Sequence, residues 1–173
     1  MPRSAGLYLS IAAFVAACSS SSTSPDPDKA SGTATATSRA GSTSAHVEWV
    51  HVPVGMDPTS FVKSELDRAK QDKKRLLVYV GATWCEPCQR FHKAAEAGEL
   101  DTVFPDLRFV DLDNDADASI ITELGCGSKM IPLFAIPDAS GHCTERRVEG
   151  GIKGDGAVGY ISPRLRAMVG PVE

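Results

Sequence analysis

Beyond the first quarter of the chain, apolar residues change repeatedly between strand-like and helix-like spacing. Segment 47–52 is rich in valine and tryptophan and predicts a short strand. Asp57 and Pro58 suit the N-cap and the first position of a helix, and apolar side chains recur after them at helical spacing. The uninterrupted apolar run 76–80 has the length of a strand and predicts a central strand buried on both faces.

The rest of the chain continues this pattern and ends in two adjacent strands and a helix. The predicted elements are a helix at 89–97, a strand at 107–112, a helix at 116–124, strands at 131–136 and 143–148, and a helix at 157–169. Pro163 lies inside the last helix and is a candidate breaker of it. The order β-α-β-α-β-α-β-β-α predicts an α/β domain over residues 46–173, in which a final antiparallel hairpin joins a parallel core to make a mixed sheet.

The first residues have the pattern of an export signal. Arg3 precedes an uncharged apolar run at 5–17, which is too short to span a membrane and fits the core of a secretory signal. Small residues then stand directly before Cys18, which resembles the cleavage site of bacterial lipoproteins, where the cysteine becomes the lipidated first residue. We therefore expect a signal peptide at 1–17 and a lipid anchor on Cys18. An ordinary secretory signal, which would leave Cys18 free, is the alternative.

Residues 18–45 separate this signal from the domain. After Cys18 the segment is dominated by Ser, Thr, Ala, Gly and Pro, so it has little apolar surface to bury and is expected to be a flexible tether. A coil of this length averages about 30 Å end to end. Such a tether would hold the domain near a membrane yet clear of it. An O-glycosylated stalk is the alternative.

Composition and charge narrow the classes of function. Hydrophobic residues make up 42% of the 173 residues, which is enough for the core of one domain. The formal net charge of -4 argues against a nucleic-acid-binding protein, which usually presents a basic face to phosphates. Nothing in the sequence offers the roughly 20 consecutive apolar residues of a mature membrane span.

Cys85 and Cys88 are the residues with the clearest chemistry. They lie between the buried strand and the following helix, and only two residues separate them. The positive end of a helix stabilises a thiolate, which is the reactive form of cysteine. We predict that Cys85 attacks disulfides and that Cys88 resolves the mixed disulfide by attacking Cys85. Pro87 fixes the backbone of the turn between them.

The motif Trp84-Cys85-Glu86-Pro87-Cys88, with Ile131-Pro132 at the start of a later strand, resembles the thioredoxin superfamily. The resemblance covers about residues 47–169 and is strongest to membrane-associated members such as the C-terminal domain of DsbD-type reductases. It implies a three-layer α/β/α fold in which Pro132 is cis and faces the cysteines. It also implies that Ile131 pairs its backbone with an extended substrate and that Trp84 shields the sulfurs. The implied substrate-binding residues are Trp84, Pro87, Ile131 and Pro132.

Two positions depart from the family pattern. Thioredoxins usually carry a buried aspartate six residues before the first cysteine, where it helps to move a proton, and this chain has Tyr79 there. Proton transfer to Cys88 would then depend on water, or on Glu86 if that side chain reaches it. Glu86 also stands beside Cys85, where its carboxylate should disfavour the thiolate and raise the pKa of the Cys85 thiol. That effect favours a reductant over a strong oxidant.

These features predict a thiol:disulfide oxidoreductase, specifically a protein-disulfide reductase, that needs no bound cofactor and no metal. Its expected partners are client proteins with disulfides or thiols and an unidentified electron donor, and we expect a monomer. The expected location is an extracytoplasmic membrane face of a bacterium, on the periplasmic side of the outer membrane if the source is Gram-negative. The direction of electron flow and the clients are not written in the sequence.

Two other functions stay open at this point. A non-catalytic thioredoxin-like module would use the groove beside Pro132 to hold a client without turnover. A metal-handling lipoprotein would use Cys85, Cys88 and His92, although no second CxxC or HxxxH supplies further ligands. Otherwise His92 is expected to be a solvated or packed helix residue.

The remaining cysteines and acidic residues have simpler interpretations. The same resemblance implies that Cys126 lies in a loop near the active site and Cys143 at the far end of the following strand, so we favour two separate thiols, with Cys126 packed in the interior. A redox role for Cys126 and a Cys126–Cys143 disulfide are the alternatives. Acidic residues cluster after the strand at 107–112 and lack the glycine and distal glutamate of a calcium loop. They predict a solvated strand exit and helix start.

Overall fold

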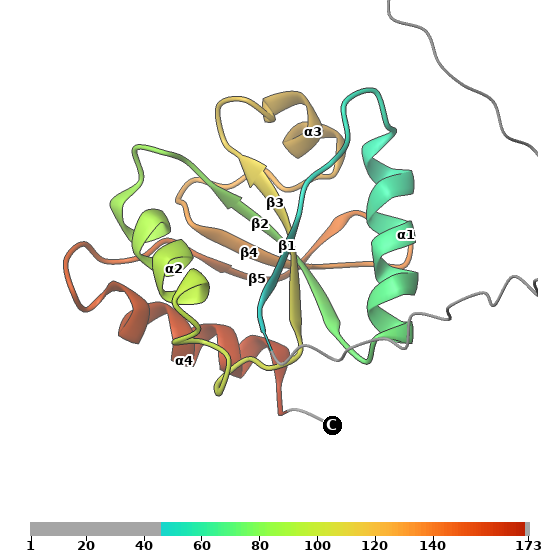
Figure 1. Cartoon of the computed structure of the whole chain (residues 1–173). Coiled ribbons are helices and arrows are strands. Elements are labelled where there is room, and N and C mark those ends of the chain that lie inside the picture. The colour runs from blue at the N-terminus through green and yellow to red at the C-terminus, as the bar shows by residue number, and fades with distance from the viewer. Residues whose placement is uncertain (1–45, 172–173) are drawn as a thin grey trace, which may run out of the picture. The chain divides into compact units, whose positions relative to one another are not determined.

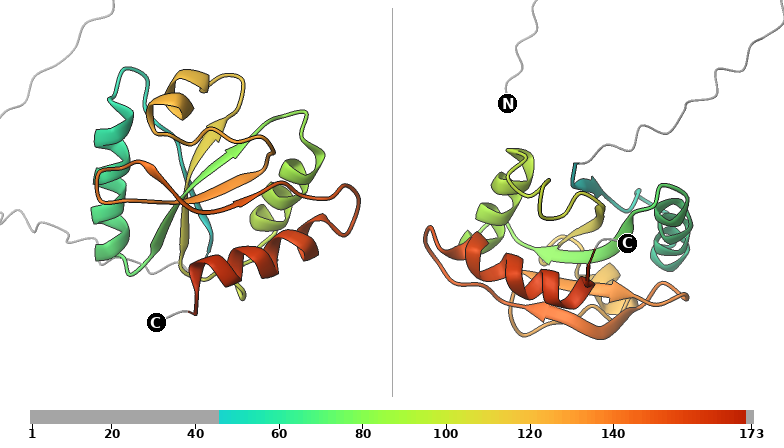
Figure 2. Two further views of the ribbon diagram at one scale, coloured as in Figure 1. Left: turned by 180° about the vertical axis from the view of Figure 1, so that it is seen from behind. Right: turned by 90° about the horizontal axis from the view of Figure 1, so that it is seen from below.

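A computed structural model of the chain describes residues 46–171, so the predicted signal, tether and Cys18 lie outside the described residues. The described domain holds a mixed sheet whose strand order is β1-β3-β2-β4-β5, with helices on both of its faces (Figures 1 and 2). The elements follow the predicted order and are β1 (Glu48–Val50), α1 (Pro58–Gln71), β2 (Arg75–Gly81), α2 (Glu86–Glu96), β3 (Leu107–Asp113), α3 (Ala118–Glu123), β4 (Leu133–Pro137), β5 (Cys143–Glu149) and α4 (Ala157–Val169). The predicted fold class is confirmed.

Local sequence signals act where they were expected, with two differences. The Asp57 carboxylate caps α1 by accepting a hydrogen bond from the Ser60 N–H at 2.7 Å, and Pro58 is the first helical residue. Helix α2 begins at Glu86, three residues earlier than predicted, because Cys85 serves as its N-cap. Pro163 lies inside α4 without ending it. Within residues 46–171 no helix has the length and apolar character needed to cross a membrane.

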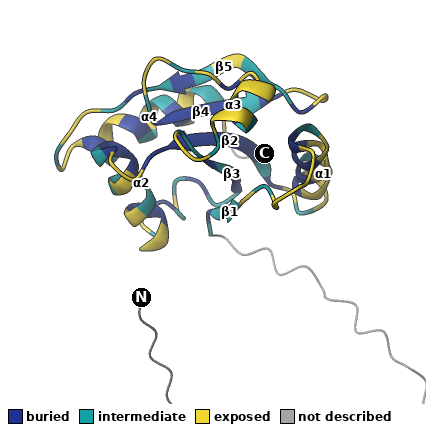
Figure 3. Ribbon diagram, turned by 90° about the horizontal axis from the view of Figure 1, so that it is seen from above, coloured by how far each residue is buried: buried dark blue, intermediate teal, exposed yellow. Residues whose placement is uncertain are grey.

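Strand β2 divides the interior into two cores. Its residues alternate, so that Leu77 and Tyr79 pack into one cluster with α2 and α4, while Leu76, Val78 and Val80 pack into a second cluster with α1 and α3. Figure 3 shows the central strands β2, β3 and β4 as mostly buried and the outer faces of the helices as exposed. The prediction that β2 is buried on both faces is therefore confirmed.

Strand directions bring the candidate active-site segments to one edge of the sheet. β2 pairs parallel to β3, and β4 pairs antiparallel to β2. The end of β2, from which the chain enters α2, therefore lies beside the start of β4, where Val80 is the register partner of Leu133. Residues 82–88 and 131–132 meet at this edge for that reason.

A cluster of buried charges joins β1, α1 and β3. Arg108 forms ion pairs with Glu48, Glu65 and Asp72 at 2.6, 3.4 and 3.0 Å, and Lys74 also pairs with Glu48. Burial acts to raise the pKa of Glu48, but hydrogen bonds from Lys74 and Arg108 outweigh it and lower that pKa. These contacts satisfy charges that would otherwise be costly to bury.

Cys126 and Cys143 form a disulfide with their Cα atoms 5.2 Å apart, so the expectation of two separate thiols is wrong. Cys126 lies only three residues after the end of α3, and the Cys143 N–H donates a hydrogen bond to the Leu124 carbonyl at 2.8 Å. The loop that leaves α3 is thus next to the start of β5, and it reaches the active-site edge only further along, at Pro132. The bond belongs to the core on the α1 and α3 face, whereas Cys85 and Cys88 belong to the other core.

Removing this second disulfide should destabilise the domain. The disulfide closes a loop of sequence separation 17 and so restricts the conformations of the unfolded chain. In the variant with Cys126→Ser and Cys143→Ser this restriction is lost, and the free energy of unfolding should fall by about 3 kcal/mol. Urea unfolding of the oxidised wild type and the double variant measures the difference. Peptide mapping without reduction serves as the control for the pairing. Equal unfolding midpoints, or unlinked peptides, would contradict the assignment.

Candidate active site

Cys85 and Cys88 form a disulfide at the first turn of α2, with their Cα atoms 5.2 Å apart. The Cys88 N–H points at the Cys85 sulfur, 3.3 Å away, so an N–H group of the helix start lies where a Cys85 thiolate would carry its charge. Cys85 is 5% exposed and Cys88 2%, so both residues are buried. Their roles as attacking and resolving sulfurs stay predictions.

The peptide bond between Ile131 and Pro132 is cis, as the family resemblance implied. Pro132 is fixed to the segment after β5, because the Gly150 N–H donates to its carbonyl at 2.8 Å. A Cβ atom on Gly151 would lie 2.8 Å from Pro87 Cβ and 3.5 Å from Pro132 Cδ. The missing side chain of Gly151 therefore lets three segments converge beside the cysteines, and sequence reasoning did not identify this glycine.

Large apolar side chains are exposed on the segments around the disulfide. Trp84 is 64% exposed, and its Nε1–H donates to Asp115 at 2.7 Å, which ties the indole to the loop after β3. Met130 and Ile152 are also exposed, and Met130 borders Gly150. Sequence reasoning identified Trp84 and missed Met130 and Ile152, whose only signal was their closeness to Pro132 and to the Gly150-Gly151 pair.

The Glu86 side chain is bound to other groups and does not serve proton transfer to Cys88. Both of its carboxylate oxygens accept hydrogen bonds from the Gly154 N–H at 3.1 Å, and Arg90 forms an ion pair with it. The Arg90 side chain, and then the Gly154 N–H, lower the pKa of Glu86. Arg90 also pairs with Asp155 at 2.8 Å. The carboxylate is already bound, which removes the reason to expect it to carry a proton to Cys88.

Tyr79 occupies the position of the usual family aspartate and is almost completely buried. Its hydroxyl has no hydrogen-bond partner among the described residues. Burial, and then the charges of Asp111 and Asp113, raise the pKa of Tyr79, so it stays protonated at neutral pH. A Cβ atom on Gly81 would overlap the Tyr79 hydroxyl, so the glycine makes room for this ring.

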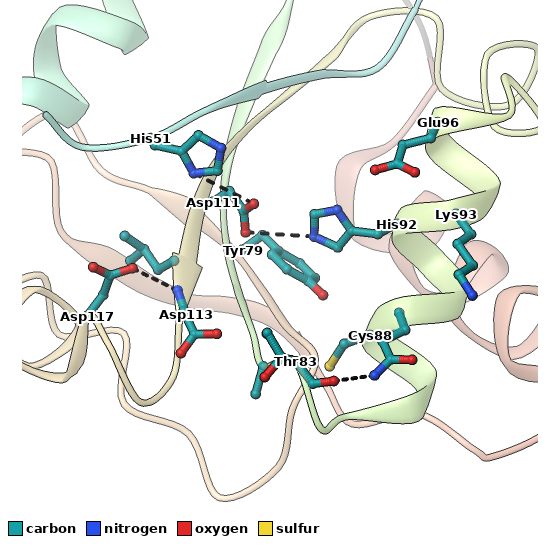
Figure 4. A pocket seen from close by; sticks show the side chains of 14 residues that line it. His51, Tyr79, Thr83, Cys88, His92, Lys93, Glu96, Asp111, Asp113 and Asp117 are labelled. Carbon is teal, nitrogen blue, oxygen red and sulfur yellow. Dashed lines mark hydrogen bonds and ion pairs between the residues drawn. The ribbon is translucent and has the colours of Figure 1, made fainter.

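An open pocket of about 420 Å³ adjoins Cys88 and Tyr79 (Figure 4). Its wall on the α2 side includes His92, whose ring stacks on Trp49 with 3.9 Å between ring centroids and whose Nε2 lies 3.7 Å from Asp111 Oδ1. The lining residues are His51, Tyr79, Gly81, Ala82, Thr83, Cys88, Gln89, His92, Lys93, Glu96, Asp111, Leu112, Asp113 and Asp117. His92 is therefore a packed helix residue, which is one of the interpretations left open above.

The acidic residues after β3 bind backbone N–H groups. Asp113 accepts hydrogen bonds from the N–H groups of Asp115 and Ala116 at 2.9 and 3.0 Å, and Asp117 accepts one from the N–H of Asp113 at 2.8 Å. These contacts shape the turn into α3. Between residues 46 and 171, no group of three or more His, Cys, Asp or Glu side chains is arranged to hold a metal ion.

Comparison with known proteins agrees with this geometry. A family model described as thioredoxin-like matches residues 57–138. A search of curated proteins found no match.

Several solved structures resemble the chain at low sequence identity. A chain from the complex of ferredoxin:thioredoxin reductase and thioredoxin f2 is 22% identical, with 73% of this chain and 94% of that chain covered and a TM-score of 0.45. A mutant thioredoxin from Halobacterium salinarum is 19% identical, with 75% and 96% covered and a TM-score of 0.44. A thioredoxin from Trypanosoma brucei brucei is 20% identical, with 70% and 91% covered and a TM-score of 0.42.

The family match spans the segment from the N-cap of α1 to the end of β4, and so includes the cysteine pair and the cis proline. The described domain thus has a thioredoxin-like fold, and residues 57–138, which match the family model, contain the disulfide-forming pair Cys85–Cys88.

Proposed function

We propose that this chain is an extracytoplasmic protein-disulfide reductase that exchanges disulfides with client proteins through Cys85 and Cys88. The observation that carries the proposal is the pairing of these two sulfurs at the start of α2, next to cis-Pro132. A thioredoxin-like fold with such a pair supports thiol:disulfide exchange in general. The reducing direction, the location and the lipid anchor are the finer parts of the proposal.

The reaction needs no group beyond the two cysteines. The Cys85 thiolate attacks one sulfur of a client disulfide, forms a mixed disulfide and releases the other client sulfur as a thiolate. The Cys88 thiolate then attacks Cys85, the Cys85–Cys88 bond forms, and the second client sulfur leaves. The dithiol of the protein loses two electrons and the client disulfide gains them. An electron donor must later reduce the protein again.

The surface around the disulfide suits an extended, partly unfolded client. Trp84, Met130 and Ile152 present apolar side chains there, and the cis peptide Ile131-Pro132 lies at the same edge of the sheet as the cysteine pair. Exposed apolar side chains of this kind commonly mark sites of protein interaction. We expect the client segment to lie along residues 131–132 while its sulfur reaches Cys85.

The ionised Glu86 carboxylate supports the reducing direction. Glu86 is the first residue of α2 and follows Cys85 directly, so its negative charge opposes a thiolate on Cys85. Arg90 and the Gly154 N–H offset part of that charge and also keep the carboxylate ionised, since they lower its pKa. A less stable thiolate disfavours the dithiol form and gives a lower reduction potential.

The N-terminal pattern and the second disulfide support an extracytoplasmic location. Disulfides persist in oxidising compartments and are rare in the reducing cytosol of mesophilic organisms. The Cys126–Cys143 bond lies in the core on the sheet face opposite the active site, and we assign it no part in exchange. The proposed lipid on Cys18 would keep the domain at a membrane.

Activity should depend on Cys85. Wild-type protein is expected to accelerate the reduction of insulin by dithiothreitol, and Cys85→Ser is expected to abolish that acceleration, because the attacking sulfur is gone. Cys18→Ser, the same substitution outside the domain, serves as the matched control and should retain full turnover. Full turnover in Cys85→Ser would contradict exchange through Cys85. No acceleration by the wild type would instead support a client-binding module without catalysis.

The reduction potential should lie nearer the thioredoxin value of about -270 mV than the value of about -120 mV of a strong oxidant. Glu86→Gln removes the charge beside Cys85, stabilises the thiolate and is expected to raise the potential. Equilibration with glutathione buffers measures both proteins. Asp155→Asn is the control, because it removes the other partner of Arg90 without changing a charge next to Cys85. A wild-type potential near the upper value would contradict the reducing direction.

Membrane attachment should depend on Cys18. When the full chain is expressed in a bacterial host, the wild type is expected in the detergent phase of a membrane extract. The Cys18→Ser variant should be exported or retained without lipid and partition into the aqueous phase. Identical partitioning of the two proteins would rule out the proposed anchor.

A further inference from the structure

Cys88 has to lose a proton before it can attack Cys85, and its environment makes this difficult. The residue is 2% exposed, and a buried thiol ionises less readily than one in water. The residue that the family pattern would lead us to expect as a proton carrier is replaced by Tyr79, which stays protonated because burial and nearby carboxylates raise its pKa. Glu86 is bound to Gly154 and Arg90. Water or another side chain must therefore exchange this proton.

The pocket beside Cys88 contains the remaining candidates. Asp113 and Asp117 accept hydrogen bonds from backbone N–H groups and hold the turn before α3. Lys93 and Glu96 are exposed on α2. The charged or titratable side chains that line the pocket, from all elements around it, are His51, Tyr79, Cys88, His92, Lys93, Glu96, Asp111, Asp113 and Asp117.

His92 differs from these groups in its position relative to Cys88. It follows Cys88 by four residues in α2, so the two side chains lie on the same face of the helix, one turn apart. Both line the pocket, and Figure 4 shows the Cys88 sulfur and the His92 ring directed into it from α2, with Tyr79 beside them. The pocket is open to solvent, so a water molecule can join the two groups where they do not meet directly.

Neighbouring side chains hold the His92 ring in place. The imidazole stacks on Trp49 at 3.9 Å and meets the Tyr79 ring edge-on at 5.0 Å between centroids. Its Nε2 faces Asp111 Oδ1 at 3.7 Å, so the carboxylate helps to orient the ring. Imidazole exchanges protons near neutral pH, which is what a reversible thiol step requires.

We propose that His92 is the group that takes the proton from Cys88 when the mixed disulfide is resolved. The inference rests on the proposed function. The Cys88 S–H proton passes to the imidazole, directly or through water, and the Cys88 thiolate attacks Cys85. The Cys85–Cys88 bond forms, the bond to the client sulfur breaks, and that sulfur leaves as a thiolate. When the disulfide is reduced again, His92 returns the proton to Cys88.

Ellman's reagent can test the step on the reduced full chain in a stopped-flow experiment. Attack by Cys85 releases one thionitrobenzoate and leaves a mixed disulfide, and attack by Cys88 on Cys85 releases the second. The Cys85→Ser variant identifies which phases belong to the pair. At pH 7, His92→Gln is expected to slow the second release at least tenfold and to leave the first unchanged. The deficit should shrink as the pH rises above about 8.5, where an ordinary thiol ionises without help.

Two further variants make the result specific. His51→Gln removes the other histidine near Asp111. The His51 side chain is 71% exposed and lies on a different segment, so both phases should stay within about twofold of the wild type. Asp111→Asn keeps His92 but removes the carboxylate beside it, so it should slow only the second phase, and it replaces His92→Gln as the test if that variant does not fold.

The outcomes separate this inference from the proposed function. If the wild type shows no paired release beyond that of Cys85→Ser, the oxidoreductase proposal itself fails. If the wild type shows both phases and His92→Gln matches it at pH 7, only the role of His92 is overturned. If His92→Gln slows both phases equally, or if its slower second phase persists unchanged at high pH, His92 has a structural role, and its proposed role in proton transfer is overturned as well.

Discussion

The structure around the two reactive sulfurs depends on how helix α2 begins. The first N–H groups of a helix have no partners within it, and here the Cys88 N–H points at the sulfur of its N-cap residue, Cys85. The reactive sulfur is therefore part of the helix cap. The same groups that complete the helix would stabilise a thiolate at that place. The N–H groups at the start of α2 thus account for both the local folding and the reactivity. The neighbouring segments serve to bring a client to the Cys85 sulfur.

The fold could be predicted largely from local patterns, because the elements that matter most have strong ones. The apolar run of β2 and the Asp57-Pro58 start of α1 each determine an element through residues that are adjacent in the sequence. The start of α2 was placed too late, since cysteine is not among the usual capping residues. Pro163 did not end α4, which shows that packing of a helix face can outweigh a local preference.

The parts of the site that sequence reasoning missed depend on contacts between distant segments. Gly151 matters because Pro87 and Pro132 approach it, and those residues are far from it in the chain. The state of the Glu86 carboxylate depends on Gly154, 68 positions later in the sequence. The Cys126–Cys143 bond was missed because the direction in which the chain leaves α3 has no signature in composition. The reactive residues were found from their spacing, whereas their surroundings required the three-dimensional arrangement.

The tyrosine at position 79 has a consequence for how freely this site can change. Its ring makes aromatic contacts with Trp49, Phe91 and Phe134, and Gly81 leaves space for its hydroxyl. A single exchange to the carboxylate common in thioredoxins would place an ionisable group among aromatic rings and leave a void that none of them fills. Several neighbours would have to change together before that exchange became tolerable. The residue at position 79, and the proton chemistry that it permits, can therefore change only together with the rings packed around it.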